Sequence, residues 1–244
     1  VVNPVTDKLE RGEITNALHK VSVKKSSRTF VSGAGTKTAT TEYKILADNS
    51  NSYALRAASF MAGQLNAATN ASFKVELYNV DSENPVTSSS KYIIIGCKNL
   101  FTQCGLSMPQ DDLGPAGYYI RTYGNSVFIE VFMNDGYQMG TLAFLREVVG
   151  YDMIAHDTVA YEKDGATLPD MEIIERPDYD YRNMTNWMTD DGKYGMGYNY
   201  QSIFTYISQD GGKTDKASVH NIFKYLPVEK YLKDNPEWYS SNST

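Results

Sequence analysis

The sequence predicts an α+β fold in which helices pack on a mixed β-sheet. Three observations predict it. Apolar residues recur at helical spacing over residues 137–150 and end at a glycine. Residues 91–96 form a continuous apolar strand of the kind that is buried on both faces. Residues 117–132 predict a hairpin, because Gly124 and Asn125 tolerate the positive backbone angles that tight turns demand.

The first strand and helix are predicted at residues 43–68. Residues 43–47 favour a short strand, and the polar cluster at 48–52 can turn the chain and cap the next helix. That helix is predicted over residues 53–68, where apolar residues share one face. The face consists of Ala54, Ala58, Met61 and Leu65.

The remaining elements complete a mixed sheet that ends near Glu175. Residues 73–78 alternate like a half-buried strand, with Phe73, Val75 and Leu77 on one face. A short helix is predicted at residues 99–105. The helix at 137–149 is expected to pack on the sheet through Met139, Leu142, Ala143, Leu145, Val148 and Val149.

Residues 1–40 predict a flexible region or an edge strand. Gly33 and Gly35 do not form a dinucleotide fingerprint, because no third glycine follows at the required spacing. His19 is alone in this region and is interpreted as a surface histidine. His156 has no second histidine or cysteine at metal-ligand spacing, so we expect no structural zinc and no other metal or cofactor.

Composition and net charge limit the functions that the chain could have. The chain has 244 residues and a net charge of −6, which fits one large or two moderate domains and argues against nucleic acid as a partner. No run approaches the roughly 20 apolar residues of a membrane span, so the protein is either cytosolic or exported after loss of a signal. Cys97 and Cys104 could form a disulfide, but two separate thiols are favoured.

Four stretches, taken in order, carry a resemblance to known proteins. They are residues 93–96, residues 117–125, residues 136–150 and Arg176-Pro-Asp-Tyr-Asp-Tyr-Arg182. This series resembles the N-terminal accessory domain of bacterial α-glucuronidases and family 20 β-hexosaminidases, and of a related bacterial glycoside hydrolase-like family of unknown function. In those families an α/β domain precedes a (β/α)8 barrel. The segment at 220–239 looks most like the family of unknown function.

The resemblance implies three regions and a carbohydrate partner. Residues 1–40 would be an extension or edge strand, 41–175 the accessory domain, and 176–244 the incomplete beginning of the barrel. Arg182 would then reach sugar hydroxyls, although an ion pair with Asp178, Asp180 or Glu175 is the alternative. The further substrate-binding candidates are Asn186, Trp187 and His220.

No catalytic residue is assigned within the chain. Glycoside hydrolysis needs two carboxyls about 5–9.5 Å apart, and Asp190 and Asp191 are interpreted as a solvated acidic turn. A barrel takes about 250 residues, so we expect the catalytic carboxylates outside this chain, which alone would be inactive. The alternatives are a non-catalytic carbohydrate-binding module and a protein-interaction domain. The expected location is extracellular or on the cell surface, and a homodimer would cover exposed barrel edges.

Overall fold

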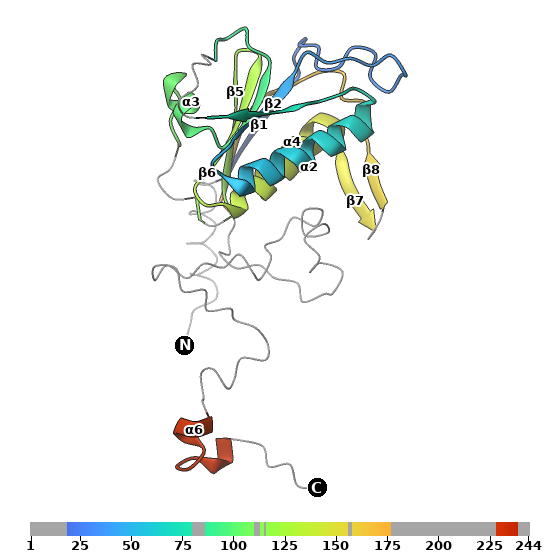
Figure 1. The fold of residues 1–244 in the computed structure, drawn as a ribbon. Coiled ribbons are helices and arrows are strands. Elements are labelled where there is room, and N and C mark those ends of the chain that lie inside the picture. Colours follow the sequence, from blue (N-terminus) through green and yellow to red (C-terminus); the bar gives the residue numbers. More distant parts are fainter. Residues whose placement is uncertain are drawn as a thin grey trace, which may run out of the picture. The chain divides into compact units, whose positions relative to one another are not determined.

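Seven strands form one mixed sheet in the order β1-β9-β5-β6-β4-β2-β3 (Figure 1). Strands β2, β3, β4 and β6 run parallel to their neighbours among themselves, whereas β5, β9 and β1 are added as antiparallel strands. The strands are β1 Lys20–Lys24, β2 Lys44–Asp48, β3 Val75–Tyr78, β4 Tyr92–Ile95, β5 Tyr118–Tyr123, β6 Ser126–Val131 and β9 Asp170–Glu175. The predicted α+β class with a mixed sheet is confirmed.

The computed structural model describes residues 19–79, 86–109, 113–114, 116–155, 158–176 and 228–238. These belong to two compact units, Val1–Gln201 and Ser202–Thr244. The sheet and its helices lie in the first unit. The predicted barrel start at 176–244 falls mostly outside the described residues, so it stays a prediction, as do the domain boundaries.

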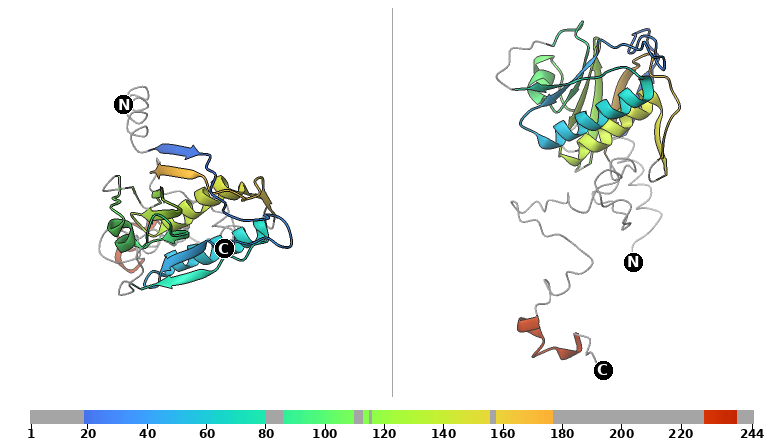
Figure 2. Two further views of the ribbon diagram at one scale, coloured as in Figure 1. Left: turned by 90° about the horizontal axis from the view of Figure 1, so that it is seen from above. Right: turned by 45° about the vertical axis from the view of Figure 1, so that its right-hand side comes forward.

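Helices cover both faces of the sheet. Helices α2, Ser52–Thr69, and α4, Asp135–Val149, lie side by side on one face, as both views show (Figures 1 and 2). Helix α3, Lys98–Gln103, packs on the opposite face through Leu100 and Phe101. The sheet therefore separates two apolar clusters, one beneath α2 and α4 and one beneath α3.

The cap on α2 comes from the polar cluster that precedes it. The side chain of Asn51 accepts hydrogen bonds from the backbone N–H groups of Tyr53 and Ala54, which have no partner within the helix. The helix ends at Asn70, which has a left-handed conformation. The predicted helix at 53–68 is thus confirmed, with all four residues of its predicted face buried.

Glycines of α4 let this helix pack in close contact with the sheet. A Cβ atom at Gly136 would come within 2.2 Å of the carbonyl oxygen of Gly117. The helix ends at Gly150, whose φ of 62° suits glycine and whose N–H bonds the carbonyl oxygens of Leu145 and Arg146. The predicted helix is confirmed, and all of its six expected packing residues are buried except Ala143, which is half-buried.

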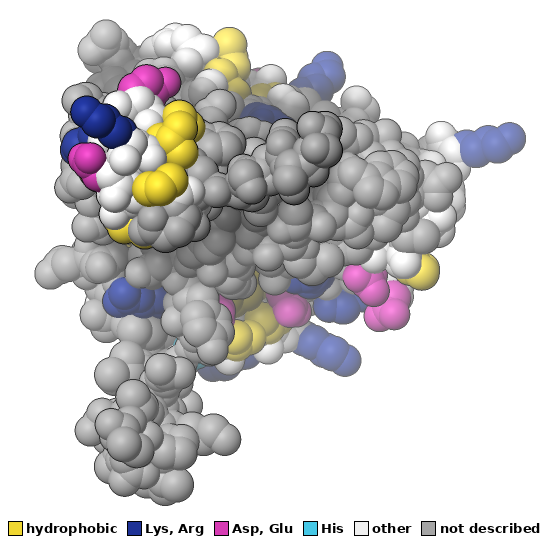
Figure 3. Space-filling model, turned by 90° about the horizontal axis from the view of Figure 1, so that it is seen from below, with side chains coloured by type: hydrophobic (Ala, Val, Ile, Leu, Met, Phe, Trp, Pro, Cys, Tyr) yellow, Lys and Arg dark blue, Asp and Glu magenta, His cyan; other side chains and the backbone are white. Residues whose placement is uncertain are grey.

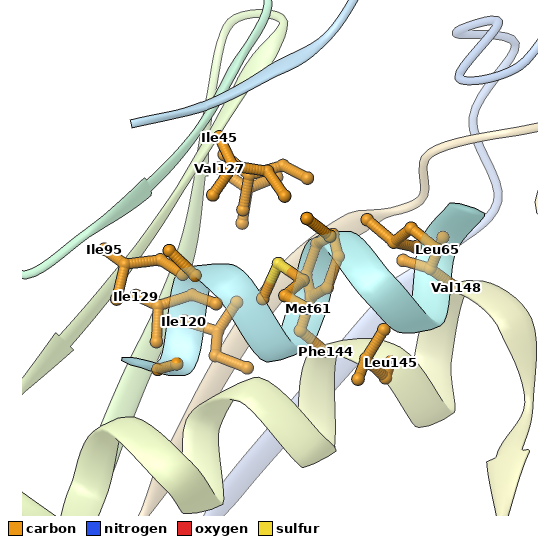
Figure 4. Packing of buried hydrophobic residues seen from close by; sticks show 14 of the residues in the cluster. Ile45, Met61, Leu65, Ile95, Ile120, Val127, Ile129, Phe144, Leu145 and Val148 are labelled. Carbon is orange, nitrogen blue, oxygen red and sulfur yellow. The ribbon is translucent and has the colours of Figure 1, made fainter. Parts of the chain in front are cut away.

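The larger core lies between the sheet and the pair α2 and α4 (Figure 4). Strand side chains from this face meet side chains of both helices, and close packing of such groups is the main stabilising term of a domain. The labelled members are Ile45, Ile95, Ile120, Val127 and Ile129 from the sheet, Met61 and Leu65 from α2, and Phe144, Leu145 and Val148 from α4.

Strands β7, Tyr151–Ala155, and β8, Thr158–Tyr161, pair only with each other. Tyr151 is buried at the base of this hairpin, whereas Ile154 is exposed. In the second unit, a short helix α6, Val228–Tyr231, precedes a 3₁₀ turn η3, Pro236–Trp238. None of the helices in the described ranges is long and apolar enough to cross a bilayer.

Two sequence predictions need correction. Leu77 was predicted with Phe73 and Val75 as the apolar face of a half-buried strand, but its side chain is 58% exposed, because β3 is the last strand of the sheet and has a neighbour on one side only. His19 is not an isolated surface residue. Its Nδ1 lies 2.7 Å from Oε2 of Glu175, and both side chains are half-buried. The two cysteines, in contrast, are free thiols as favoured, with Cys97 buried and Cys104 half-buried.

Candidate functional site

The sheet contains a topological switch point between β2 and β4. After β2 the chain enters α2 on one face and continues to β3 at the end of the sheet. After β4 it enters α3 on the opposite face and continues toward β5 and β6 on the other side of β4. In sheets of this kind, ligands bind outside the carboxyl ends of the strands at such a point. This edge is therefore the candidate site.

Polar and reactive side chains gather where the strands end. We call the set Asp48, Cys97, Lys98, Glu130 and Tyr137 the switch-point cluster. Asp48 ends β2, Cys97 and Lys98 follow β4, Glu130 is near the end of β6, and Tyr137 is in the first turn of α4. Segments far apart in sequence thus contribute to one edge of the sheet.

Close contacts hold the strand ends and helix starts together. Gly96 has a φ of 71°, and a Cβ atom there would lie 2.7 Å from the hydroxyl oxygen of Tyr137. Nδ2 of Asn51 donates to Oδ1 of Asn134 over 3.3 Å, which joins the start of α2 to the start of α4. The site is therefore a tightly packed part of the fold.

Glu130 is the most unusual member of the cluster. It is only 3% exposed, and its Oε1 has no hydrogen-bond partner among the residues that the structure describes. Burial raises the pKa of this carboxyl to about 8; Asp48 acts in the same direction, and Lys98 opposes both. The carboxyl is thus mostly protonated at neutral pH.

Two other members of the cluster, Cys97 and Tyr137, are neutral as well. Burial raises the pKa of the Cys97 thiol and of the Tyr137 phenol, and the nearby carboxyls of Glu130 and Asp48 raise both further. A buried thiol with a raised pKa is a poor nucleophile. Within the described ranges, no three His, Cys, Asp or Glu side chains are placed to hold a metal ion.

The two carboxyls of the cluster differ in their surroundings. Oδ1 of Asp48 accepts hydrogen bonds from the backbone N–H and the hydroxyl of Ser50, at 2.8 and 2.7 Å. A buried carboxyl with a raised pKa, such as Glu130, is a candidate general acid in enzymes. However, a general acid must reach the atom that it protonates, and Glu130 is closed off from solvent.

The substrate-binding residues predicted from sequence lie elsewhere in the chain. Arg182, Asn186, Trp187 and His220 are all outside the described residues, as are Asp190, Asp191 and His156. Their roles therefore stay predictions. One aromatic group of the second unit is described: Trp238 is 50% exposed, and its ring centroid lies 6.0 Å from that of Tyr231.

Sequence reasoning did not single out Glu130, although a signal was present. The residue interrupts the apolar run Val-Phe-Ile-Glu-Val-Phe at residues 127–132. A charged residue within such a run is either at a solvated position or buried at a cost. Deciding between the two requires knowing that β6 lies between β4 and β5 in the interior of the sheet.

In the view of Figure 3, Lys and Arg side chains of the described residues appear at several separate places. Several are paired with acidic groups, such as Lys20 and Arg121 with Glu172 at 2.8 Å each.

No protein-family model and no curated protein matches the sequence. Among solved structures, the chain is similar to the Streptomyces plicatus N-acetyl-β-hexosaminidase in complex with Thio-NAglucal, with 19% identity and a TM-score of 0.37. It is also similar to a mutant β-hexosaminidase of the same organism in complex with the product GlcNAc, with 14% identity and a TM-score of 0.35. Each match covers 66% of this chain but 26% of the hexosaminidase chain, about a quarter of its length. Both TM-scores are below 0.5, so the similarity carries no inference about function.

Proposed function

We propose that this chain is part of a glycoside hydrolase-like protein that acts on oligo- or polysaccharide, and that residues 19–176 form a non-catalytic domain of it. The observation that carries the proposal is that the carboxyl of Glu130 is buried and closed off from solvent. It is the one carboxyl in the described ranges with a clearly raised pKa, and it is 3% exposed. A glycosidic oxygen cannot approach it, so the catalytic carboxyls are assigned outside residues 19–176.

The arrangement of elements supports the proposed family relationship. Three of the four stretches that carry the sequence resemblance coincide with elements of the sheet domain. Residues 93–96 end β4, residues 117–125 begin the β5–β6 hairpin, and residues 136–150 are α4 with its glycine cap. The fourth stretch begins at Arg176, directly after β9.

Carbohydrate contact is assigned to the chain after Arg176. Arg182, Asn186, Trp187 and His220 are the proposed contacts, since guanidinium, amide and imidazole groups exchange hydrogen bonds with hydroxyls. Support comes from Trp238, whose half-exposed ring lies beside that of Tyr231. Flat aromatic faces with an exposed apolar surface suit the C–H groups of sugar rings.

Two measurements on the full chain test this function. Incubation with a panel of aryl glycosides should give no turnover, and turnover that Glu130→Gln abolishes would overturn the proposal of a non-catalytic domain. Calorimetry with oligosaccharides should show binding that Trp238→Ala or Arg182→Ala weakens by roughly tenfold.

Tyr53→Ala is the matched control for the binding measurement. Tyr53 is also an exposed aromatic residue, at 37%, but it lies in α2 of the sheet domain. Its loss should leave oligosaccharide affinity unchanged. Absence of any measurable binding by the unaltered chain would reject the assignment of carbohydrate contact to the residues after Arg176.

A further inference from the structure

Glu130 combines deep burial with an oxygen that has no hydrogen-bond partner within the described part of the chain. Such groups are rare in native proteins, because a buried oxygen without a partner loses its hydrogen bonds to water and gains none in return. Side chains alternate along β6, so Glu130 shares the α3 face of the sheet with Phe128, whereas Val127 and Ile129 face α2 and α4. The carboxyl therefore lies in the smaller of the two clusters.

We infer that Glu130 is the proton-binding group of a latch that holds α3 against the sheet: with the proton bound, α3 stays closed, and loss of the proton opens it. Opening gives the carboxylate access to water. The inference concerns the sheet domain alone and does not depend on which residues contact carbohydrate.

The groups around Glu130 disfavour its charged form while α3 is closed. Asp48 at the end of β2 is acidic, and Cys97 and Tyr137 are buried neutral groups. Tyr119 on β5 is directly opposite Glu130 in the strand register and is itself buried. Lys98 is the one cation in the described ranges that acts on Glu130, and its side chain is on the exposed side of α3.

Helix α3 packs through Phe101 on Phe128 and Tyr119, the neighbours of Glu130 on the same face of the sheet, and can move more easily than the helices of the other face. It has six residues, of which Leu100 and Phe101 are buried, and its N-cap residue Cys97 makes no side-chain capping bond. Helices α2 and α4 have 18 and 15 residues and bury many more side chains. Local opening occurs first where few buried contacts are lost, so hydration of Glu130 is expected through displacement of α3.

The direction of the pH effect follows from the difference in the pKa of Glu130 between the form with α3 closed and the form with α3 open. The pKa of Glu130 is about 8 when α3 is closed and returns toward the ordinary 4.5 when it is open. Opening therefore releases a proton at any pH between these values. Within this window the opening equilibrium constant should rise about tenfold per pH unit, and it should be constant below and above it.

Reactivity of the Cys97 thiol reports the opening. Cys97 is 2% exposed at the start of α3, and in a Cys104→Ser background it is the one thiol of the chain. The rate of labelling by a disulfide reagent would be measured from pH 5.5 to 9, with and without Glu130→Gln. The intrinsic reactivity of the thiol cancels in the ratio of the two rates.

The ratio should rise about tenfold per pH unit up to about pH 8 and then level off. A ratio that does not change with pH would overturn the inference. Amide hydrogen exchange of residues 98–103 on the same two proteins should give the same ratio, and a pH-dependent ratio confined to other segments would equally overturn it.

Two neighbouring substitutions test the latch even if Glu130→Gln fails to fold. Asp48→Asn removes a group that raises the pKa of Glu130, so the pH at which the labelling rate of Cys97 stops rising relative to the Glu130→Gln protein should move to a lower value. Lys98→Met removes the group that lowers this pKa, so the pH at which the labelling rate levels off should move to a higher value. Asparagine keeps the oxygen that accepts the hydrogen bonds from Ser50. If this pH moved in the same direction in both variants, the inference would be contradicted.

Discussion

The two faces of the sheet are covered in different ways. On one face, two long helices lie against a cluster made of apolar side chains, and glycines bring α4 within close contact of the strands. On the other face, a helix of six residues covers a smaller cluster that includes Glu130, Cys97 and Tyr119. The comparison indicates that the first face supplies most of the stability of the domain, while the second contains its buried carboxyl, Glu130.

The strongest test of this division compares a phenylalanine from each face. Phe144 of α4 is fully buried and packs edge-on against Phe30 at 6.4 Å. Phe144→Ala should lower the free energy of global unfolding by about 3–5 kcal/mol, since the rigid surroundings cannot fill the cavity. Phe101→Ala in α3 should cost less, because the short helix can move into the space.

Denaturant unfolding of both variants measures the difference. Hydrogen exchange shows which segment is destabilised, since Phe101→Ala should increase exchange mainly in residues 98–103. Phe101 contacts Phe128 and Tyr119 at ring distances of 5.5 and 6.1 Å, so its packing is no poorer than that of Phe144. Equal losses of global stability would show that the two faces contribute alike.

Glu130→Gln should change how stability depends on pH. The folded pKa is raised from 4.5 to about 8, so the stability linked to this group is fully present below pH 4.5 and is lost as pH rises toward 8. The loss is about 1.4 kcal/mol per pH unit in this window. The variant lacks it, so its stability relative to the unaltered protein should increase from pH 5.5 to pH 8.

Glu172→Gln is the control for this measurement. The hydrogen bond from Lys20 lowers the pKa of Glu172, so its contribution is present above pH 4.5 and is lost only as pH falls further. Between pH 5.5 and 8, this variant should differ from the unaltered protein by a constant amount. A slope in the Glu172 variant equal to that in the Glu130 variant would refute the assignment to Glu130.

Local patterns were sufficient to predict most elements of the sheet domain. Three consecutive isoleucines at 93–95, the glycine stop of α4 and the Gly124–Asn125 turn each act within a few residues. Side-chain spacing, helix caps and turn residues are determined at that range. The predicted helices and strands therefore agree with the structure to within one or two residues at most ends.

Properties that depend on distant pairing could not be predicted in this way. Leu77 is exposed because β3 is an edge strand, and His19 pairs with Glu175, which is 156 residues away. The burial of Glu130 likewise depends on strand order, which short-range patterns do not specify. The candidate site at the switch point was missed for that reason, and the sugar-binding residues predicted after Arg176 stay predictions.

A smaller effect should distinguish the glycines that face the sheet from those that do not. Gly136→Ala would place a Cβ atom 2.2 Å from the carbonyl oxygen of Gly117, so α4 must shift at a cost of about 1–3 kcal/mol. Gly63 in α2 is exposed, and a Cβ atom there would have no neighbouring atom within 4 Å. Gly63→Ala should therefore stabilise the protein by about 0.5–1 kcal/mol. Thermal unfolding of the two variants should shift in opposite directions, and a stabilising Gly136→Ala would show that α4 does not depend on this close contact.

The smallest expected effect separates two roles of Asn51 at the start of α2. Its side chain caps the helix and also donates to Asn134 at the start of α4. Asn51→Ala removes both interactions and should cost about 1 kcal/mol of unfolding free energy. Asn51→Asp keeps the capping oxygen but loses the donor, so it should recover most of that loss if the cap is the main contribution. If instead the aspartate variant is as unstable as the alanine variant, the link between the two long helices is what matters, and their face of the sheet depends on this polar contact at its edge as well as on apolar packing.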